Sequence, residues 1–118
     1  MIPTEVPVLT HGNICKNKYW QQEGVRCIVG WCDFITEDRD GVWTFEGQDV
    51  RYLAGKVTGG KIPLSQWNDR PSNTKERIAQ LFNRTTALLG YTEGNPEAAW
   101  ANRNRKKFDE FIPGWAKE

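Results

Sequence analysis

The sequence predicts a mainly helical, compact single domain over residues 1–118, with about four helices. Three observations support this prediction. Apolar residues recur at helical offsets along much of the chain, glycines and prolines separate those stretches, and 118 residues are enough to bury one hydrophobic core. The pattern also leaves open one short β-hairpin near residues 41–46, where the alternation of apolar and polar residues is too brief to establish a strand.

Composition and charge exclude several classes of protein. With 38% hydrophobic and 26% charged residues, the chain is neither disordered nor fibrous, and its formal net charge of +1 excludes a dominant polybasic arm. No apolar run reaches the roughly 18 residues that span a bilayer, and the N-terminus lacks a basic region followed by an apolar stretch. These observations predict a cytoplasmic protein without membrane contact.

The first helix is expected over Val25–Ile35, after an extended lead-in over residues 1–13. Its apolar residues recur at offsets of three and four and would form a wide buried face. They are Val25, Ile28, Val29, Trp31, Cys32 and Ile35. Glycine inside a helix costs about 1 kcal/mol relative to alanine, so Gly30 indicates that another backbone or a ligand approaches closely there.

Two further helices have recognisable ends. The second is expected over Glu46–Val57 and ends at Gly59, because glycine enters the left-handed region without a Cβ clash. The third is expected to begin with a capping box, in which Asn73 and Glu76 each satisfy the other residue's free backbone N–H. Gly90 is expected to end it.

A fourth helix is expected after Asn95, with Pro96 at its first position and Pro113 at its end. Its inward face would carry Trp100, Ala101, Phe108, Phe111 and Ile112. These aromatics either close the core or form an apolar stripe for a partner or a second copy. We expect Trp100 and Phe108 to dock on the other helices. Phe111 and Trp115 would stay near the edge, where exposed aromatic patches mark interaction sites.

The segment from Trp67 to Glu76 has a structural and a functional interpretation. In the structural one, Asn68 and Asp69 satisfy turn groups while Trp67 anchors the loop in the core. In the functional one, these residues and Thr74 line a polar pocket for a small molecule or a nucleotide at a helix N-terminus. The structural interpretation is favoured, because turn-forming residues before a helix need no ligand to explain them.

Two motifs resemble a family of small uncharacterised bacterial and phage proteins. They are Cys-x-x-Gly at Cys27–Gly30 and Trp-Asn-Asp-x-Pro-x-x-Thr at Trp67–Thr74. The resemblance covers about residues 11–89 and leaves the C-terminal helix and tail, residues 91–118, outside it. It implies the extent of the domain and the importance of the loop. It implies no activity, because the function of that family is not established.

The three cysteines are expected to be reduced, because their number is odd and no secretory signal precedes them. The alternative is a zinc site made of His11, Cys15, Cys27 and Cys32. Five residues on a helix correspond to a rotation of about 140°, which separates Cys27 from Cys32. Packing of the thiols is therefore favoured over metal binding, and neither a metal nor another cofactor is expected.

Catalysis has little support in the sequence. There is no nucleophile elbow, no phosphate-binding glycine loop and no zinc-protease motif, and a single histidine limits acid–base chemistry near neutral pH. A nucleophile pair of His11 and Cys15 would lie in the irregular lead-in, which is a poor place for a preorganised site. The sequence therefore leans away from an enzyme.

A nucleic-acid interface is a weaker alternative than protein binding. It rests on a basic cluster of Arg103, Arg105, Lys106 and Lys107. Four charges in five positions are common on the solvent-facing side of an amphipathic helix, so that interpretation is favoured.

The leading hypothesis is a non-enzymatic protein that binds another macromolecule through an aromatic-rich surface. Six tryptophans exceed what one core of this size needs, and tryptophan is prominent in protein interfaces. The candidate surface residues are Trp31, Trp67, Phe111 and Trp115. A protein partner is expected, a homo-oligomer stays open, and a phage or prophage accessory protein that engages a host or defence protein would fit.

Overall fold

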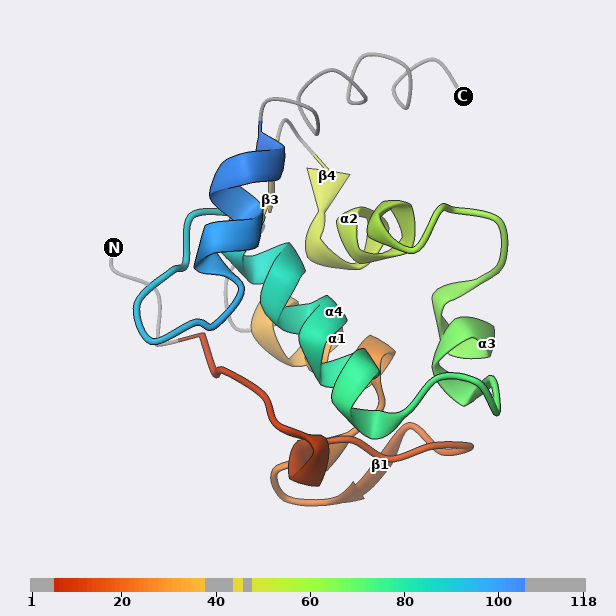
Figure 1. Ribbon diagram of the computed structural model, residues 1–118. Helices are drawn as coiled ribbons and strands as arrows, with labels where there is room; N and C mark the ends of the chain where they lie inside the picture. The colour runs from red at the N-terminus through yellow and green to blue at the C-terminus, as the bar shows by residue number, and fades with distance from the viewer. Residues whose placement is uncertain (1–5, 38–43, 46–47, 106–118) are drawn as a thin grey trace.

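Helix α4 (Lys75–Leu88) lies at the centre of the molecule and packs against helices on several sides (Figure 1). The structure is a computed structural model that describes residues 6–37, 44–45 and 48–105. Before α4, the elements in chain order are η1 (His11–Asn13), β1 (Trp20–Gln22), β2 (Val25–Arg26), α1 (Ile28–Glu37), β3 (Thr44–Phe45), β4 (Gln48–Asp49), α2 (Val50–Val57) and α3 (Leu64–Asp69). A last helical segment spans residues 98–105. The predicted mainly helical fold is confirmed.

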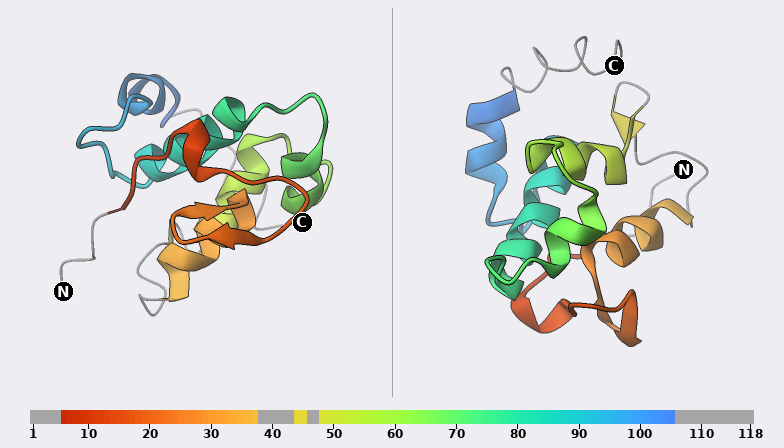
Figure 2. Two further views of the ribbon diagram at one scale, coloured as in Figure 1. Left: turned by 90° about the horizontal axis from the view of Figure 1, so that it is seen from below. Right: turned by 90° about the vertical axis from the view of Figure 1, so that its right-hand side faces the viewer.

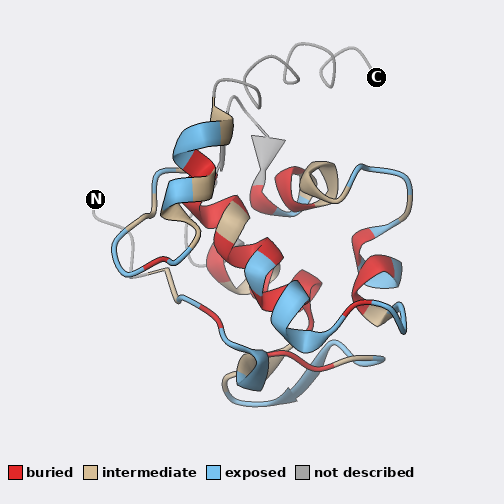
Figure 3. Cartoon of the chain, in the orientation of Figure 1, coloured by how far each residue is buried: buried red, intermediate tan, exposed pale blue. Residues whose placement is uncertain are grey.

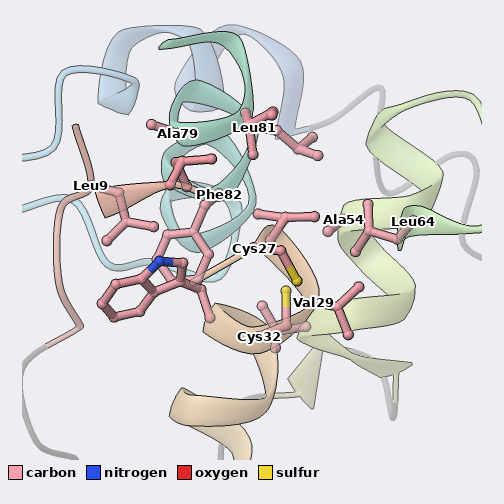
Figure 4. Packing of buried hydrophobic residues seen from close by; sticks show 14 of the residues in the cluster. Leu9, Cys27, Val29, Cys32, Ala54, Leu64, Ala79, Leu81 and Phe82 are labelled. Carbon is pink, nitrogen blue, oxygen red and sulfur yellow. The ribbon is translucent and has the colours of Figure 1, made fainter. Parts of the chain in front are cut away.

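The main core lies between α1, α2, α3 and α4, where their apolar faces meet (Figures 3 and 4). Phe82 of α4 is completely buried, and its ring lies 6.3 Å from that of Trp31 on α1. The Trp31 ring also meets Phe34 edge-on at 5.5 Å. The contact between Trp31 and Phe82 joins α1 to α4, as buried aromatic pairs do in protein cores, while the contact between Trp31 and Phe34 lies within α1.

A second apolar cluster joins α2, the end of α4 and the last helical segment. Ala101 is completely buried there, and the half-buried Trp100 lies against the same cluster with the Arg84 guanidinium 4.7 Å from its ring. The Asn95 side chain accepts the Glu97 N–H at 2.9 Å, as expected for a residue before a helix, but the helix begins at residue 98 and not at Pro96. Trp100 therefore docks as expected, whereas Phe108, Phe111, Ile112, Pro113 and Trp115 lie outside the described residues.

The glycine ends of α2 and α4 are confirmed. At both ends the second residue past the helix is a glycine with positive φ, 101° at Gly59 and 103° at Gly90. The next residue donates to a carbonyl five residues earlier: Gly60 to Gly55 at 2.9 Å, and Tyr91 to Thr86 at 3.0 Å. The glycine N–H itself donates to a carbonyl three residues earlier, Gly59 to Lys56 and Gly90 to Ala87, both at 3.0 Å. The two bonds at each helix end form a Schellman motif, which requires the left-handed conformation that glycine adopts without strain.

The predicted capping box at the start of α4 is wrong. Thr74 is the N-cap, and its side chain accepts the N–H of Arg77 at 3.1 Å. The Asn73 side chain instead donates to the carbonyl of Trp67 at 2.6 Å and is buried. A bond within the preceding loop thus takes Asn73 away from α4, and the helix begins one residue later.

Three other boundaries differ from the sequence prediction. The first helix begins at Ile28, because Val25 and Arg26 form strand β2. The second begins at Val50, after the β3–β4 hairpin, whose residues pair at Thr44 with Asp49 and at Phe45 with Gln48. Leu64–Asp69, expected as a loop, forms the six-residue helix α3. Its end at Asp69 precedes Pro71, consistent with the restriction that proline places on the residue before it.

The N-terminal segment is tied to α4 by one side chain. The Asn83 amide accepts the N–H of Leu9 and donates to its carbonyl, both at 2.9 Å. A primary amide offers the same donor and acceptor as a peptide group, so Asn83 pairs with Leu9 as a neighbouring strand would. Of the lead-in expected over residues 1–13, residues 6–10 form no helix or strand, with Thr10 extended, and His11–Asn13 form η1; residues 1–5 lie outside the described residues.

None of the helices within the described residues has the length and apolar character needed to span a membrane.

Candidate functional site

The most conspicuous surface feature is the pair of aromatic residues at the start of the β1–β2 hairpin. Trp20 is 49% exposed and Tyr19 is 48% exposed. Within the part of the chain that the structure describes, Val8 is the only other exposed large hydrophobic residue. The left view of Figure 2 looks onto the hairpin, which lies at the surface beside α1. Two adjacent exposed aromatics need an explanation other than core packing.

Gly30 of α1 sets the position of the hairpin. A Cβ at Gly30 would lie 2.8 Å from the Tyr19 carbonyl oxygen and 3.0 Å from the Cβ of Arg26. The Tyr19 carbonyl also accepts the N–H of Cys27 at 3.1 Å. The close approach predicted from a glycine inside the helix is therefore confirmed, and what approaches is the backbone of the hairpin.

Side chains of α1 hold the inner face of the hairpin. Arg26 pairs with Trp20 across the strands, and its guanidinium lies over the rings of Phe34 at 4.7 Å and Trp31 at 5.6 Å. The Tyr19 hydroxyl donates to Asp33 at 2.8 Å. Contacts with α1 thus fix the backbone that carries the two exposed aromatics. A fixed backbone loses less conformational entropy when a partner binds.

Asn68 of α3 connects α3 to the segments that carry the hairpin. Its side chain is completely buried. The amide oxygen accepts the N–H of Ile28 at 2.9 Å, and the amide nitrogen donates to the carbonyl of Cys15 at 3.2 Å. Ile28 is the first residue of α1, so Asn68 satisfies one of the N–H groups that a helix start leaves unpaired. Its polar atoms are engaged inside the protein and not presented to a ligand.

Asp69 and Lys16 complete this connection at the surface. The Asp69 carboxylate accepts the N–H groups of Asn17 at 2.7 Å and of the Asn68 side chain at 3.0 Å. The Lys16 ammonium donates to the carbonyls of Arg70 and Asn73, both at 2.6 Å. We call Asn68, Asp69 and Lys16 the support network. The network supports the structural interpretation of the loop after Trp67, because Asn68 and Asp69 bond to other parts of the same chain.

The structure places the other candidate residues from the sequence as follows. Trp31 and Trp67 are buried in the main core, where the Trp31 indole N–H donates to the Asn13 carbonyl at 2.8 Å. Thr74 is exposed and caps α4. In the basic cluster, Arg103 is exposed, while Arg105 donates to the Ala87 carbonyl at 2.9 Å. Lys106, Lys107, Phe111 and Trp115 lie outside the described residues.

The cysteines are free and buried, and they do not converge on His11. Among the described residues no three His, Cys, Asp or Glu side chains gather closely enough to hold a metal ion. His11 is exposed, whereas the Cys15 thiol donates to the Lys18 carbonyl at 3.3 Å, so the pair does not form a nucleophile site. Figure 4 shows Cys27 and Cys32 among apolar side chains. Burial raises the pKa of Cys15 above its ordinary value of 9.0, and the neighbouring Cys27 acts in the same direction.

A small cavity lies between the hairpin and α3. It encloses about 230 Å³ and is lined by Asn17, Lys18, Tyr19, Cys27, Val29, Ser65 and Asp69. Sites for drug-sized ligands and cofactors usually enclose about 300–1,000 Å³ and bury most of the ligand. This cavity is therefore smaller than a nucleotide requires.

Sequence reasoning missed Trp20 as a candidate. Its neighbours offer one signal, because a polar run follows the aromatic pair and leads into a turn at Gly24, where φ is +81°. Aromatic residues before a polar run and a glycine turn are typical of a hairpin that faces solvent. Strand β1 has only three residues, which is too short for an alternation of apolar and polar residues to be recognised in the sequence.

Comparisons with known proteins found no match, whether against protein-family models, curated proteins or solved structures. The resemblance carried by Cys27–Gly30 and Trp67–Thr74 stays a prediction.

Proposed function

We propose that this is a non-enzymatic protein that binds another protein through the β1–β2 hairpin, with Trp20 as the central contact. The observation that carries the proposal is the half-exposed Trp20 ring on a backbone that Gly30 and Arg26 hold against α1. Tryptophan is among the residues that most often dominate binding energy, and a preorganised loop loses little entropy when it binds.

A small-molecule or nucleotide site in the loop at Trp67–Thr74 has less support. Trp67 and Asn68 are buried, and the Asn68 amide already bonds to Ile28 and Cys15. The cavity beside Asp69, about 230 Å³, is small for such a ligand, and a larger one of about 680 Å³ beside Thr74 is lined by none of residues 67–73. A nucleic-acid site at residues 103–107 is also less favoured, because Arg105 bonds to the carbonyl of Ala87.

The biological setting that fits best is a cytoplasmic accessory protein of phage or prophage type that engages a host or defence protein. Small size and the lack of a recognisable catalytic motif in the sequence support this part of the proposal. It rests on analogy, since fold alone does not define function.

The experiment compares capture by Trp20→Ala with capture by Val8→Ala. Val8 is a matched control, because it is also an exposed apolar residue, 38% exposed, and lies outside the hairpin. Each variant is immobilised beside the parent protein, and bound proteins from bacterial lysate are quantified by mass spectrometry. A stoichiometric partner should be lost from Trp20→Ala, with affinity reduced about 30-fold or more, and kept by Val8→Ala. A partner that binds both variants equally would contradict the proposal.

A further inference from the structure

The charges beside the hairpin are unbalanced. We call Lys16, Lys18, Arg70 and Lys75 the basic rim. Lys18, Arg70 and Lys75 are exposed, and within the described part of the chain none of the rim side chains forms an ion pair. Three of the four are positive charges at the surface, and Lys16 is half-buried.

The residues of the rim lie close together although they are far apart in the sequence. The ammonium of Lys16 contacts the backbone of both Arg70 and Asn73, and Lys75 follows two residues later. Lys18 and Lys75 both lie close enough to the Cys15 thiol to oppose the effect of burial on its pKa, whereas the Asp69 carboxylate adds to that effect. Lys18 is also only two residues from Trp20, so the rim borders the exposed aromatics.

Carboxylates also lie near the rim: Asp69 precedes Arg70, and the exposed Glu76 follows Lys75. Asp69 accepts N–H groups from Asn17 and Asn68, and Asp33 accepts the hydroxyl of Tyr19. Glu23 pairs with Arg26 at 3.7 Å. Hydrogen bonds from neutral groups leave the charges of Asp69 and Asp33 in place, so the four cations of the basic rim face Asp69, Asp33 and Glu76. The surface around Trp20 therefore keeps a small net positive charge together with aromatic area.

We infer that the partner segment received at the hairpin is acidic, with an apolar or aromatic side chain against Trp20 and Asp or Glu residues facing the basic rim. This inference rests on the proposed function and adds the chemistry of the partner. Complementary charge gives specificity and speeds association, while the buried aromatic contact supplies most of the affinity. Single-stranded nucleic acid would also present negative charge and stacking faces, and it is treated as an outcome of the test.

The test selects displayed random peptides on the immobilised full-length protein and sequences the binders. Peptides from the parent protein should be enriched in Asp and Glu around an apolar residue, and they should be lost on Trp20→Ala. A synthetic peptide of the selected sequence should bind about tenfold more weakly to the double variant Lys18→Glu/Lys75→Glu, and binding should weaken as salt rises.

The control variant is Arg51→Glu/Lys61→Glu, which changes the charge by the same amount at two exposed residues on α2 and in the loop after it. It should bind the peptide as the parent protein does. Circular dichroism checks that every variant is folded.

Three outcomes would overturn the inference. Binders that need Trp20 but show no acidic enrichment, or that tolerate the rim variant, contradict the acidic partner and leave the proposed function standing. A selection without any Trp20-dependent binder contradicts both. Quenching of tryptophan fluorescence by a 15-residue oligothymidylate, lost in Trp20→Ala, would identify a nucleic-acid surface instead.

Discussion

The support network bonds to the segments on either side of the β1–β2 hairpin, at Cys15, Asn17 and Ile28, yet the network and the hairpin use their conspicuous side chains in opposite ways. Asn68 is completely buried, with bonds to Ile28 and Cys15. Trp20 turns about half of its side-chain surface to solvent. The sequence made the loop after Trp67 the more prominent candidate, but the structure gives Asn68 and Asp69 internal partners. The difference shows that conspicuous polar residues, here Asn68 and Asp69, can have a structural role, while the candidate binding residues lie on a neighbouring segment.

The largest expected effect tests whether the support network is structural. Asn68→Ala would leave the N–H of Ile28 and the carbonyl of Cys15 buried without their partner, so the free energy of unfolding should fall by about 2–4 kcal/mol. Asp69→Ala should cost less, about 1 kcal/mol, because Asp69 is only half-buried. Gln66→Ala is the control, since Gln66 is exposed on the same helix.

Urea denaturation measures all three variants. Equal stability of Asn68→Ala and Gln66→Ala would show that the buried amide does not join α3 to α1.

A second test concerns the contact between α1 and the hairpin. Gly30→Ala would place a methyl group 2.8 Å from the Tyr19 carbonyl, so the hairpin must shift and the protein should lose about 1–3 kcal/mol of stability. Amide chemical shifts of Tyr19 and Trp20 should change with it. Gly55→Ala is the matched control, because no atom lies within 4 Å of its added Cβ and alanine favours the helix by up to about 1 kcal/mol.

If Gly30→Ala is as stable as Gly55→Ala and leaves the hairpin signals unchanged, the close approach does not position Trp20.

The smallest effect concerns Cys15, which lies between the two regions. Its pKa is raised above 9.0 in the folded protein by burial, so the unfolded chain loses this proton at lower pH than the folded protein does. Its contribution to stability is complete below about pH 9 and is lost as pH rises through the folded pKa. Cys15→Ala should therefore have a weaker decline of stability between pH 8 and about pH 11 than the parent protein. Identical declines would show that the thiol titrates equally in both states.

Features governed by local geometry were predictable from the sequence. Gly30 inside a helix predicted a close approach, and Gly59 and Gly90 predicted the ends of α2 and α4, because only glycine avoids a Cβ penalty at such positions. The sequence also predicted that Asn68 and Asp69 satisfy backbone groups and do not bind a ligand. Their actual partners lie about 40–53 residues away in the chain, at distances where a residue pattern carries no information.

Short elements and the choice among tryptophans were not predictable. Helix α3 has six residues, too few for a 3.6-residue period to repeat, and strand β1 has three. Composition indicated a surplus of tryptophan, but burial depends on tertiary contacts. Trp31 lies against Phe34 and Phe82, while Trp20 lies on a strand whose three residues are all exposed. The capping residue of α4 was misassigned for a similar reason, since the carbonyl of Trp67 takes the Asn73 side chain.

The pairing of Asn83 with Leu9 has a consequence for how the chain is made. The two residues are 74 positions apart, and a ribosome adds about 5–20 residues per second, so Leu9 waits roughly 4–15 s before Asn83 exists. During that interval the backbone next to η1 has no partner on α4. The segment that leads into the hairpin can therefore take its final position on α4 only after Asn83 has been made, whereas the contacts of the hairpin with α1 can form earlier.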